Sequence, residues 1–254
     1  MHPIFLTFTA LAAAALVSAC GGGGGDAPTA TQVAALDGYY QGTVSTGNQF
    51  QLLALENGQF YSLVGTTDAQ GVFRVSSLVE GRGTTTNGTF ATSSVKEFTS
   101  TGQVLSESLS ATYVPKTSVA GTLTSSSGAV TFNGTAPASN NYNYDTAATL
   151  SAVSGSWSGS SLYGEGQTIA ISATGAITGT SALGCHYTGT ASPRASGKNV
   201  LDVTVAFGPA PCALPGQSGS GVGVSTVLAN GRQQLLVALT NADRSAGIVV
   251  FAQR

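Results

Sequence analysis

The sequence predicts an all-β protein of two similar antiparallel meander domains, each an up-and-down barrel or a small sandwich of about eight strands. Three observations carry this prediction. Apolar side chains alternate with polar ones along many short runs, so that Leu201, Val203 and Val205 share one face of a predicted strand. Asn-Gly pairs at 57–58 and 230–231 lie between such runs and favour tight hairpins. A glycine, aromatic, glycine motif occurs twice and divides the chain.

The repeated motif reads Gly38-Tyr39-Tyr40-Gln41-Gly42 in the first half and Gly155-Ser156-Trp157-Ser158-Gly159 in the second. Its glycine, tryptophan, glycine form resembles the first strand of lipocalin-like barrels, and the resemblance implies a barrel that can carry a small apolar ligand. Between the halves, Pro137 and a polar run interrupt the alternation. We therefore expect an N-terminal β domain at 37–136, a linker at 137–153 and a C-terminal β domain at 154–254, each domain of ordinary size.

The N-terminus is typical of an exported protein. Residues 4–19 form an apolar run of about 16 residues, which suits a signal peptide and is short for a membrane span of ~20. The run ends in Leu16-Val17-Ser18-Ala19-Cys20, which resembles the lipobox of bacterial lipoproteins. The resemblance implies a signal peptide at 1–19 and fatty acyl chains such as palmitate on Cys20. Met1-His2-Pro3 lacks the usual positive charge.

The residues after Cys20 predict a tether and a location. Five glycines follow the cysteine directly, so residues 20–36 are expected to form a flexible, Gly-rich tether. In enterobacterial lipoproteins, an Asp directly after the lipidated cysteine resembles the signal for retention in the inner membrane, and this chain has Gly21 at that position. We expect a lipid anchor in the bacterial outer membrane, with the periplasmic and the surface-exposed leaflet both open.

Composition excludes several classes of partner. The chain has nine Lys and Arg, eleven Asp and Glu, and only 8% charged residues, so it lacks the basic face that nucleic acids or a polybasic membrane contact would need. Apolar residues make up 42%, enough for a folded core. The expected partners are the membrane, through the N-terminal lipid, and an envelope or host surface component, with no nucleic acid.

Two cysteines remain after lipidation. In an oxidising compartment, Cys185 and Cys212 are expected to form a disulfide that closes a loop of about 27 residues and stabilises the fold by roughly 3 kcal/mol. The alternatives are a catalytic thiol or a metal-binding pair. Since the mature chain has one histidine, His186, we expect no metal and no cofactor. A calcium loop at Asp145 is less favoured than a linker.

Catalytic motifs are missing from the sequence. No Gly-x-Ser-x-Gly elbow is present, because Trp157 occupies the nucleophile position of the nearest candidate. Phosphate-binding Gly-rich motifs are missing too, and the eleven acids leave a glycosidase-type carboxylate pair open without indicating one. The expected function is a non-enzymatic binding or structural module at the cell surface. The alternatives are a lipocalin-like carrier, favoured by the many small residues of the second half, and an enzyme of unknown type.

A strand count places one candidate surface. The second half is expected to have eight strands, at 155–160, 167–173, 175–181, 184–191, 199–207, 219–228, 232–240 and 246–253. In an up-and-down meander, the loops after the odd strands gather at one end, and these loops hold or border both cysteines. We therefore expect Tyr163, His186, Asp243 and Arg244 to form a binding rim there. The alternative is that Asp243 and Arg244 order a turn while His186 packs beside the disulfide.

The C-terminal half also resembles uncharacterised β-rich lipoproteins of proteobacteria. The resemblance is carried by Gly184-Cys185-His186-Tyr187, Pro193-Arg194, Cys212 and Asn241-Ala242-Asp243-Arg244. It implies an envelope lipoprotein and brings no known activity. Arg194 and Lys198 are expected at the end of the meander opposite the rim.

Overall fold

The computed structural model describes residues 35–69, 71–137, 142–228 and 230–254. The predicted signal peptide, Cys20 and nearly all of the predicted tether lie outside these residues, as does part of the predicted linker. Within the described ranges, no helix has both the length and the apolar character needed to cross a bilayer. By their contacts, the described residues form one compact unit.

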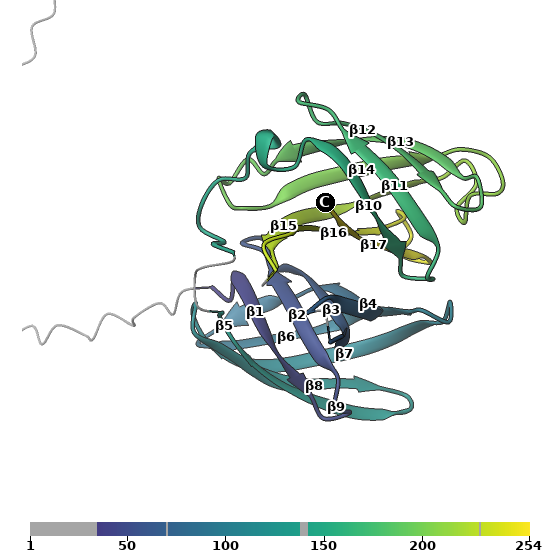
Figure 1. Cartoon of the computed structure of the whole chain (residues 1–254). Coiled ribbons are helices and arrows are strands. Elements are labelled where there is room, and N and C mark those ends of the chain that lie inside the picture. Colours follow the sequence, from purple (N-terminus) through teal and green to yellow (C-terminus); the bar gives the residue numbers. More distant parts are fainter. Residues whose placement is uncertain (1–34, 70, 138–141, 229) are drawn as a thin grey trace, which may run out of the picture. The chain divides into compact units, whose positions relative to one another are not determined.

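The first half of the chain forms a closed antiparallel barrel, drawn in purple to teal in Figure 1. Its strands are β1 (Gly38–Val44), β2 (Gln49–Ala54), β3 (Gln59–Thr67), β4 (Phe73–Arg82), β6 (Thr89–Thr99), β7 (Val104–Val114), β8 (Ser118–Ser125) and β9 (Gly128–Thr135). Pairing of β1 with β9 and of β4 with β6 closes the ring. The short β5 (Thr84–Thr86) is a ninth strand that pairs only with β6.

The second half forms another closed barrel, drawn in green to yellow in Figure 1. Its strands are β10 (Gly155–Ser161), β11 (Gly166–Ile171), β12 (Ala176–Ser181), β13 (His186–Pro193), β14 (Leu201–Phe207), β15 (Ser218–Val227), β16 (Gln233–Thr240) and β17 (Gly247–Gln253). Every bound lies within two residues of the sequence expectation. The all-β class and the antiparallel meander are confirmed, and each half is a barrel rather than a sandwich. The domain boundaries stay a prediction.

The two barrels open in the same way. Tyr40 and Trp157, the aromatic residues of the repeated motif, are both almost fully buried. Each hydrogen-bonds the carbonyl oxygen four residues earlier: Tyr40 Oη donates to Leu36 at 2.9 Å and Trp157 Nε1 donates to Val153 at 2.7 Å. In each barrel, this hydrogen bond links the first strand to a residue two positions before it.

The barrels also close in the same way. Gly42 and Gly159 are the second glycines of the motif, and each lies where the first strand meets the last. A Cβ atom on Gly42 would lie 1.9 Å from the carbonyl oxygen of Asn133, and one on Gly159 would lie 2.0 Å from that of Phe251. Only glycine fits at either position. The internal similarity seen in the sequence therefore corresponds to equivalent positions in two barrels.

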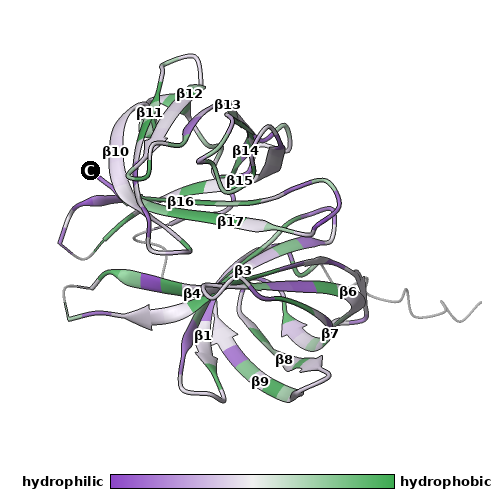
Figure 2. Ribbon diagram, turned by 90° about the vertical axis from the view of Figure 1, so that its right-hand side faces the viewer, coloured by the Kyte–Doolittle hydropathy of each residue, from purple (hydrophilic) through white to green (hydrophobic). Residues whose placement is uncertain are grey.

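A hydrophobic cluster joins the outer faces of the two barrels. It contains Leu53, Leu63, Leu78 and Phe98 from the first barrel, Val222, Val224, Leu236 and Val249 from the second, and Tyr142 and Tyr144 from the connection. As a result, β16 is buried along both of its faces, and Figure 2 shows its hydrophobic stretch in green. The barrels are packed against each other through apolar side chains.

Candidate functional site

The N-terminal barrel contains a cavity of about 390 Å³. All eight strands that close the barrel contribute lining residues. The larger apolar side chains of the lining are Phe50, Leu52, Phe60, Leu109, Leu123 and Phe132. Serine and threonine residues from β3, β4 and β6 also line the cavity. Because their side chains are short, they leave volume that larger side chains would fill.

One end of this barrel is filled and the other is not. Tyr40, Phe90 and Tyr113 are buried at the end near Leu36, and Phe60 packs edge-on against Phe90 with ring centroids 5.7 Å apart. Phe60 also lines the cavity and so forms part of its floor. Toward the opposite end, inward side chains such as Leu123 are only partly buried, and the lining continues into the turn between β1 and β2. The cavity therefore opens at the end that carries this turn.

Glu107 places a carboxylate in the lining. It lies on β7, where Leu105, Leu109 and Ala111 share its alternation, and the residue is only 8% exposed. Its Oε2 atom is buried and has no hydrogen-bond partner within the described part of the chain. Burial, and then the nearby charge of Glu97, raises the pKa of the Glu107 carboxyl to about 7. A group with that pKa changes its charge near neutral pH.

The interior of the C-terminal barrel is nearly filled. Its cavity is about 80 Å³, and the side chains around it include Ile169, Ile171 and Ile177. Tyr187 Oη donates a hydrogen bond of 3.0 Å to Gln167 Oε1 across this interior, and burial raises the Tyr187 pKa to about 12. The polar groups here are therefore satisfied by one another.

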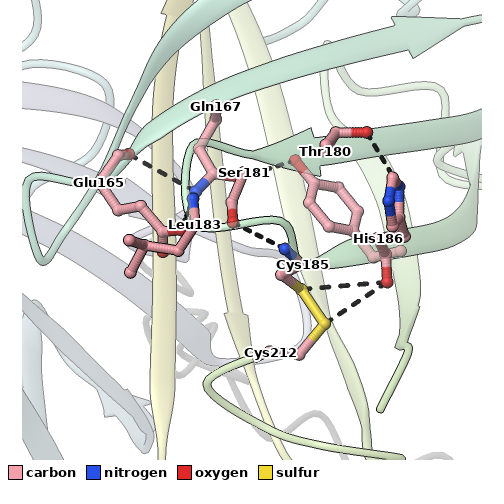
Figure 3. Close-up of a disulfide and its surroundings, with 9 residues drawn as sticks. Glu165, Gln167, Thr180, Ser181, Leu183, Cys185, His186 and Cys212 are labelled. Carbon is pink, nitrogen blue, oxygen red and sulfur yellow. Dashed lines mark hydrogen bonds between the residues drawn. A yellow bond between two sulfur atoms is a disulfide. The ribbon is translucent and has the colours of Figure 1, made fainter. Parts of the chain in front are cut away.

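The predicted disulfide between Cys185 and Cys212 is present, with Cα atoms 4.5 Å apart. Figure 3 shows that the His186 ring points to Thr180 rather than to the sulfur atoms. His186 Nδ1 lies 3.2 Å from Thr180 Oγ1 on the exposed face of β13. The histidine that sequence reasoning placed on the rim thus lies next to the disulfide along the chain and points outward.

The other residues of the predicted rim lie in different surroundings. Tyr163 lines the small cavity and donates a hydrogen bond of 3.3 Å to the carbonyl oxygen of Gly247. Asp243 accepts hydrogen bonds from Ser245 and orders its own turn. Only Tyr163 of the four therefore faces the barrel mouth, and a binding role for the whole rim stays a prediction.

Arg244 crosses to the N-terminal barrel. Its Nε lies 2.6 Å from Glu80 Oε2, its Nη2 donates to the Glu80 carbonyl oxygen at 2.9 Å, and its Nη1 donates to Ser94 Oγ at 3.0 Å. The Glu80 side chain is 5% exposed, so this ion pair is largely shielded from water. Arg244 thus links the two barrels by an ion pair and hydrogen bonds, in addition to the hydrophobic cluster between them.

The opposite end of the C-terminal barrel also carries ion pairs. Arg194 contacts Glu56 and Asp202. Lys198 Nζ lies 2.8 Å from Asp145 Oδ1, and this pairing helps to hold the Asp145 pKa below its usual value. Across the described ranges, no three or more His, Cys, Asp or Glu side chains gather in a way that could hold a metal ion.

Sequence reasoning named no site residue in the N-terminal barrel, and so it missed Glu107. The available signal was a carboxylate in phase with the apolar residues of a predicted strand, since inward positions along 104–114 read Leu105, Glu107, Leu109, Ala111 and Tyr113. An acid at an inward position of a barrel is costly unless something pairs with it.

Comparisons with known proteins add nothing to the fold and the site described above. No protein-family model matches the chain, and no curated protein matches it. Among solved structures it is similar to a mutant of the vaccine antigen transferrin binding protein B from Haemophilus parasuis Hp5, with 9% sequence identity and a TM-score of 0.28. The similarity covers 82% of this chain and 60% of that one, so the chain spans less than two thirds of its length. A likeness this distant carries no inference about activity.

Proposed function

We propose that this protein is a lipid-anchored, non-enzymatic binding protein of the bacterial outer membrane, whose N-terminal barrel holds a small, largely apolar ligand. The observation that carries the proposal is the cavity of about 390 Å³. Ligand sites in proteins are concave, mostly apolar and about 300–1,000 Å³ in volume, with a few polar groups that orient the ligand. The second barrel, with about 80 Å³ free, packs against the first through the hydrophobic cluster.

A neutral apolar dye tests the ligand site. We would titrate N-phenylnaphthylamine into the mature chain from residue 20, carrying Cys20→Ser so that no acyl chain is attached. Saturable fluorescence enhancement with one site per chain is expected. Val130→Phe places a ring in the N-terminal cavity and should weaken dye binding about tenfold or more, while Val237→Phe, in the C-terminal barrel, should leave it unchanged if the variant folds. Equal dye affinity in wild type and Val130→Phe would overturn the proposal.

The anchor is tested separately, because it rests on the sequence that resembles a lipobox. Metabolic labelling with a palmitate analogue should tag the wild-type protein in membranes and should miss Cys20→Ser. Equal labelling of the two forms would show that Cys20 carries no lipid, and would leave the ligand site untouched.

A further inference from the structure

The strongest feature outside the packing of the fold is the carboxylate of Glu107. The residue is more than nine-tenths buried, it lines the N-terminal cavity, and its Oε2 has no protein partner in the described part of the chain. A buried carboxylate without a partner is strongly disfavoured, because water solvates the charge far better than an apolar interior does. Such a group is either protonated or paired with something that enters the cavity.

The charged groups that line the cavity with Glu107 all have one sign. From the neighbouring strand β6, Glu97 lines the same cavity. The described lining residues on β1, β2, β3, β4, β8 and β9 are apolar residues and serines, and the turn between β1 and β2 adds one threonine and one asparagine, so none of these elements presents a titratable group to the cavity. Lys96, next to Glu97 in the chain, is engaged with Ser106 outside. The cavity is thus apolar with a negative interior.

We propose that the N-terminal cavity binds a small amphiphile whose apolar body lies against Phe50, Leu109 and Phe132 and whose single ammonium group pairs with the Glu107 carboxylate. The inference rests on the proposed function, since it names the chemical class of that ligand. An ammonium group supplies both the positive charge and the N–H donors that the Glu107 carboxylate lacks. A ligand carboxylate would instead face two acids.

The pH dependence follows from the same pair. Because the Glu107 pKa lies near 7, the carboxylate is mostly ionised at pH 8 and mostly protonated at pH 5.5. An alkylamine, with a pKa similar to that of Lys, stays charged across this range. The apparent affinity scales with the fraction of protein that is ionised, so binding of an amine should weaken by up to about thirtyfold between pH 8 and pH 5.5.

Three probes of equal chain length distinguish the possibilities. Octylamine, octanol and octanoate would each be used to displace N-phenylnaphthylamine from the mature Cys20→Ser chain at pH 8. Octylamine is expected to bind on the order of tenfold more tightly than octanol, as a charged hydrogen bond would provide, and octanoate should bind most weakly. Displacement by all three with equal affinity would overturn the inference and leave the proposed function intact. No binding of dye or probes would overturn both.

Two glutamate variants complete the test. Glu107→Gln keeps the shape and removes the charge, so the octylamine to octanol affinity ratio should fall to about one and its pH dependence should vanish. Glu165→Gln is the matched control, because Glu165 lines the small cavity of the other barrel, and it should keep the wild-type ratio. A thermal melt of each variant establishes that it is folded. A ratio that persists in folded Glu107→Gln would overturn the inference.

Discussion

The two barrels share a scaffold and differ in their contents. Both begin with a buried aromatic residue that bonds a carbonyl four residues back, and both close at a glycine in the first strand. The C-terminal barrel then fills its interior around Trp157 with isoleucine, valine and tyrosine, and leaves about 80 Å³. The N-terminal barrel directs residues such as Ser62 and Ser77 inward and keeps about 390 Å³.

The difference teaches that different residues determine how a barrel closes and how far its interior is filled. Eight strands give an interior that side chains can just fill, or that can hold one small ligand, and the size of the inward residues decides between these outcomes. Both outcomes occur here in one chain. Each of the following experiments changes one feature that distinguishes the barrels.

The largest effect is expected from Trp157, which is 1% exposed in the filled barrel. Trp157→Ala removes the centre of that core and leaves a cavity, so the free energy of unfolding should fall by about 3–5 kcal/mol. Chemical denaturation followed by tyrosine fluorescence or circular dichroism measures it. A loss below about 1 kcal/mol would mean that the C-terminal barrel is not the better packed of the two.

The disulfide comes next, because it crosslinks only the C-terminal barrel across 27 residues. Replacing both Cys185 and Cys212 by alanine should lower the free energy of unfolding by about 3 kcal/mol in the chain-entropy model. Dye binding in the N-terminal cavity should be unchanged at a temperature where the variant is folded. Loss of dye binding in the folded variant would show that the two interiors are coupled.

A matched pair of substitutions tests the filling itself. Val237→Phe adds volume to the small cavity, and overpacking there should cost about 1–3 kcal/mol. Val130→Phe adds the same volume to the large cavity, where there is room, and should cost less than about 1 kcal/mol. Thermal unfolding of the two variants side by side gives the comparison. Equal costs would contradict the difference in free volume.

The smallest effect concerns Glu107. Its folded pKa of about 7 lies above the ordinary value of 4.5, so the folded state binds more protons between these values and stability falls as pH rises through that window. Glu107→Gln should therefore stabilise the protein at pH 8 by an amount of the order of 1 kcal/mol and by almost nothing at pH 4. Melting temperatures at both pH values check this sign. Destabilisation at pH 8 would indicate a protein partner for the carboxylate.

The sequence predicted the strands of the second half well, because alternation and turn residues are local signals. Leu201, Val203 and Val205 face inward in β14 as expected, and the number of strands counted between Cys185 and Cys212 placed both cysteines at one end of the meander. The disulfide confirmed that reasoning. Arg244 could not be placed in the same way, because its partner Glu80 is 164 residues away in the chain.

The interior volumes were harder to predict. The many small residues of the second half suggested that its barrel would be poorly filled, but residues such as Thr178, Thr188, Thr190 and Thr204 point outward, where Thr190 and Thr204 pair through their hydroxyl groups at 2.8 Å. Amino-acid composition does not reveal whether a residue lies on the inner or the outer face of its strand. The larger cavity lies in the N-terminal barrel. To predict it from the sequence, one would have to know which residues of all eight strands face the barrel interior.

The strand β16, buried on both faces in the folded protein, is exposed in the unfolded chain. The run Leu235-Leu236-Val237-Ala238-Leu239 is apolar and uncharged and contains no proline or glycine, which are properties of segments that assemble into intermolecular sheets. In the folded protein, β15 and β17 pair with both edges of the strand, and the other barrel covers its outer face. This protection needs nearly the whole chain, so the run stays open to self-association until the last strand has been made and paired.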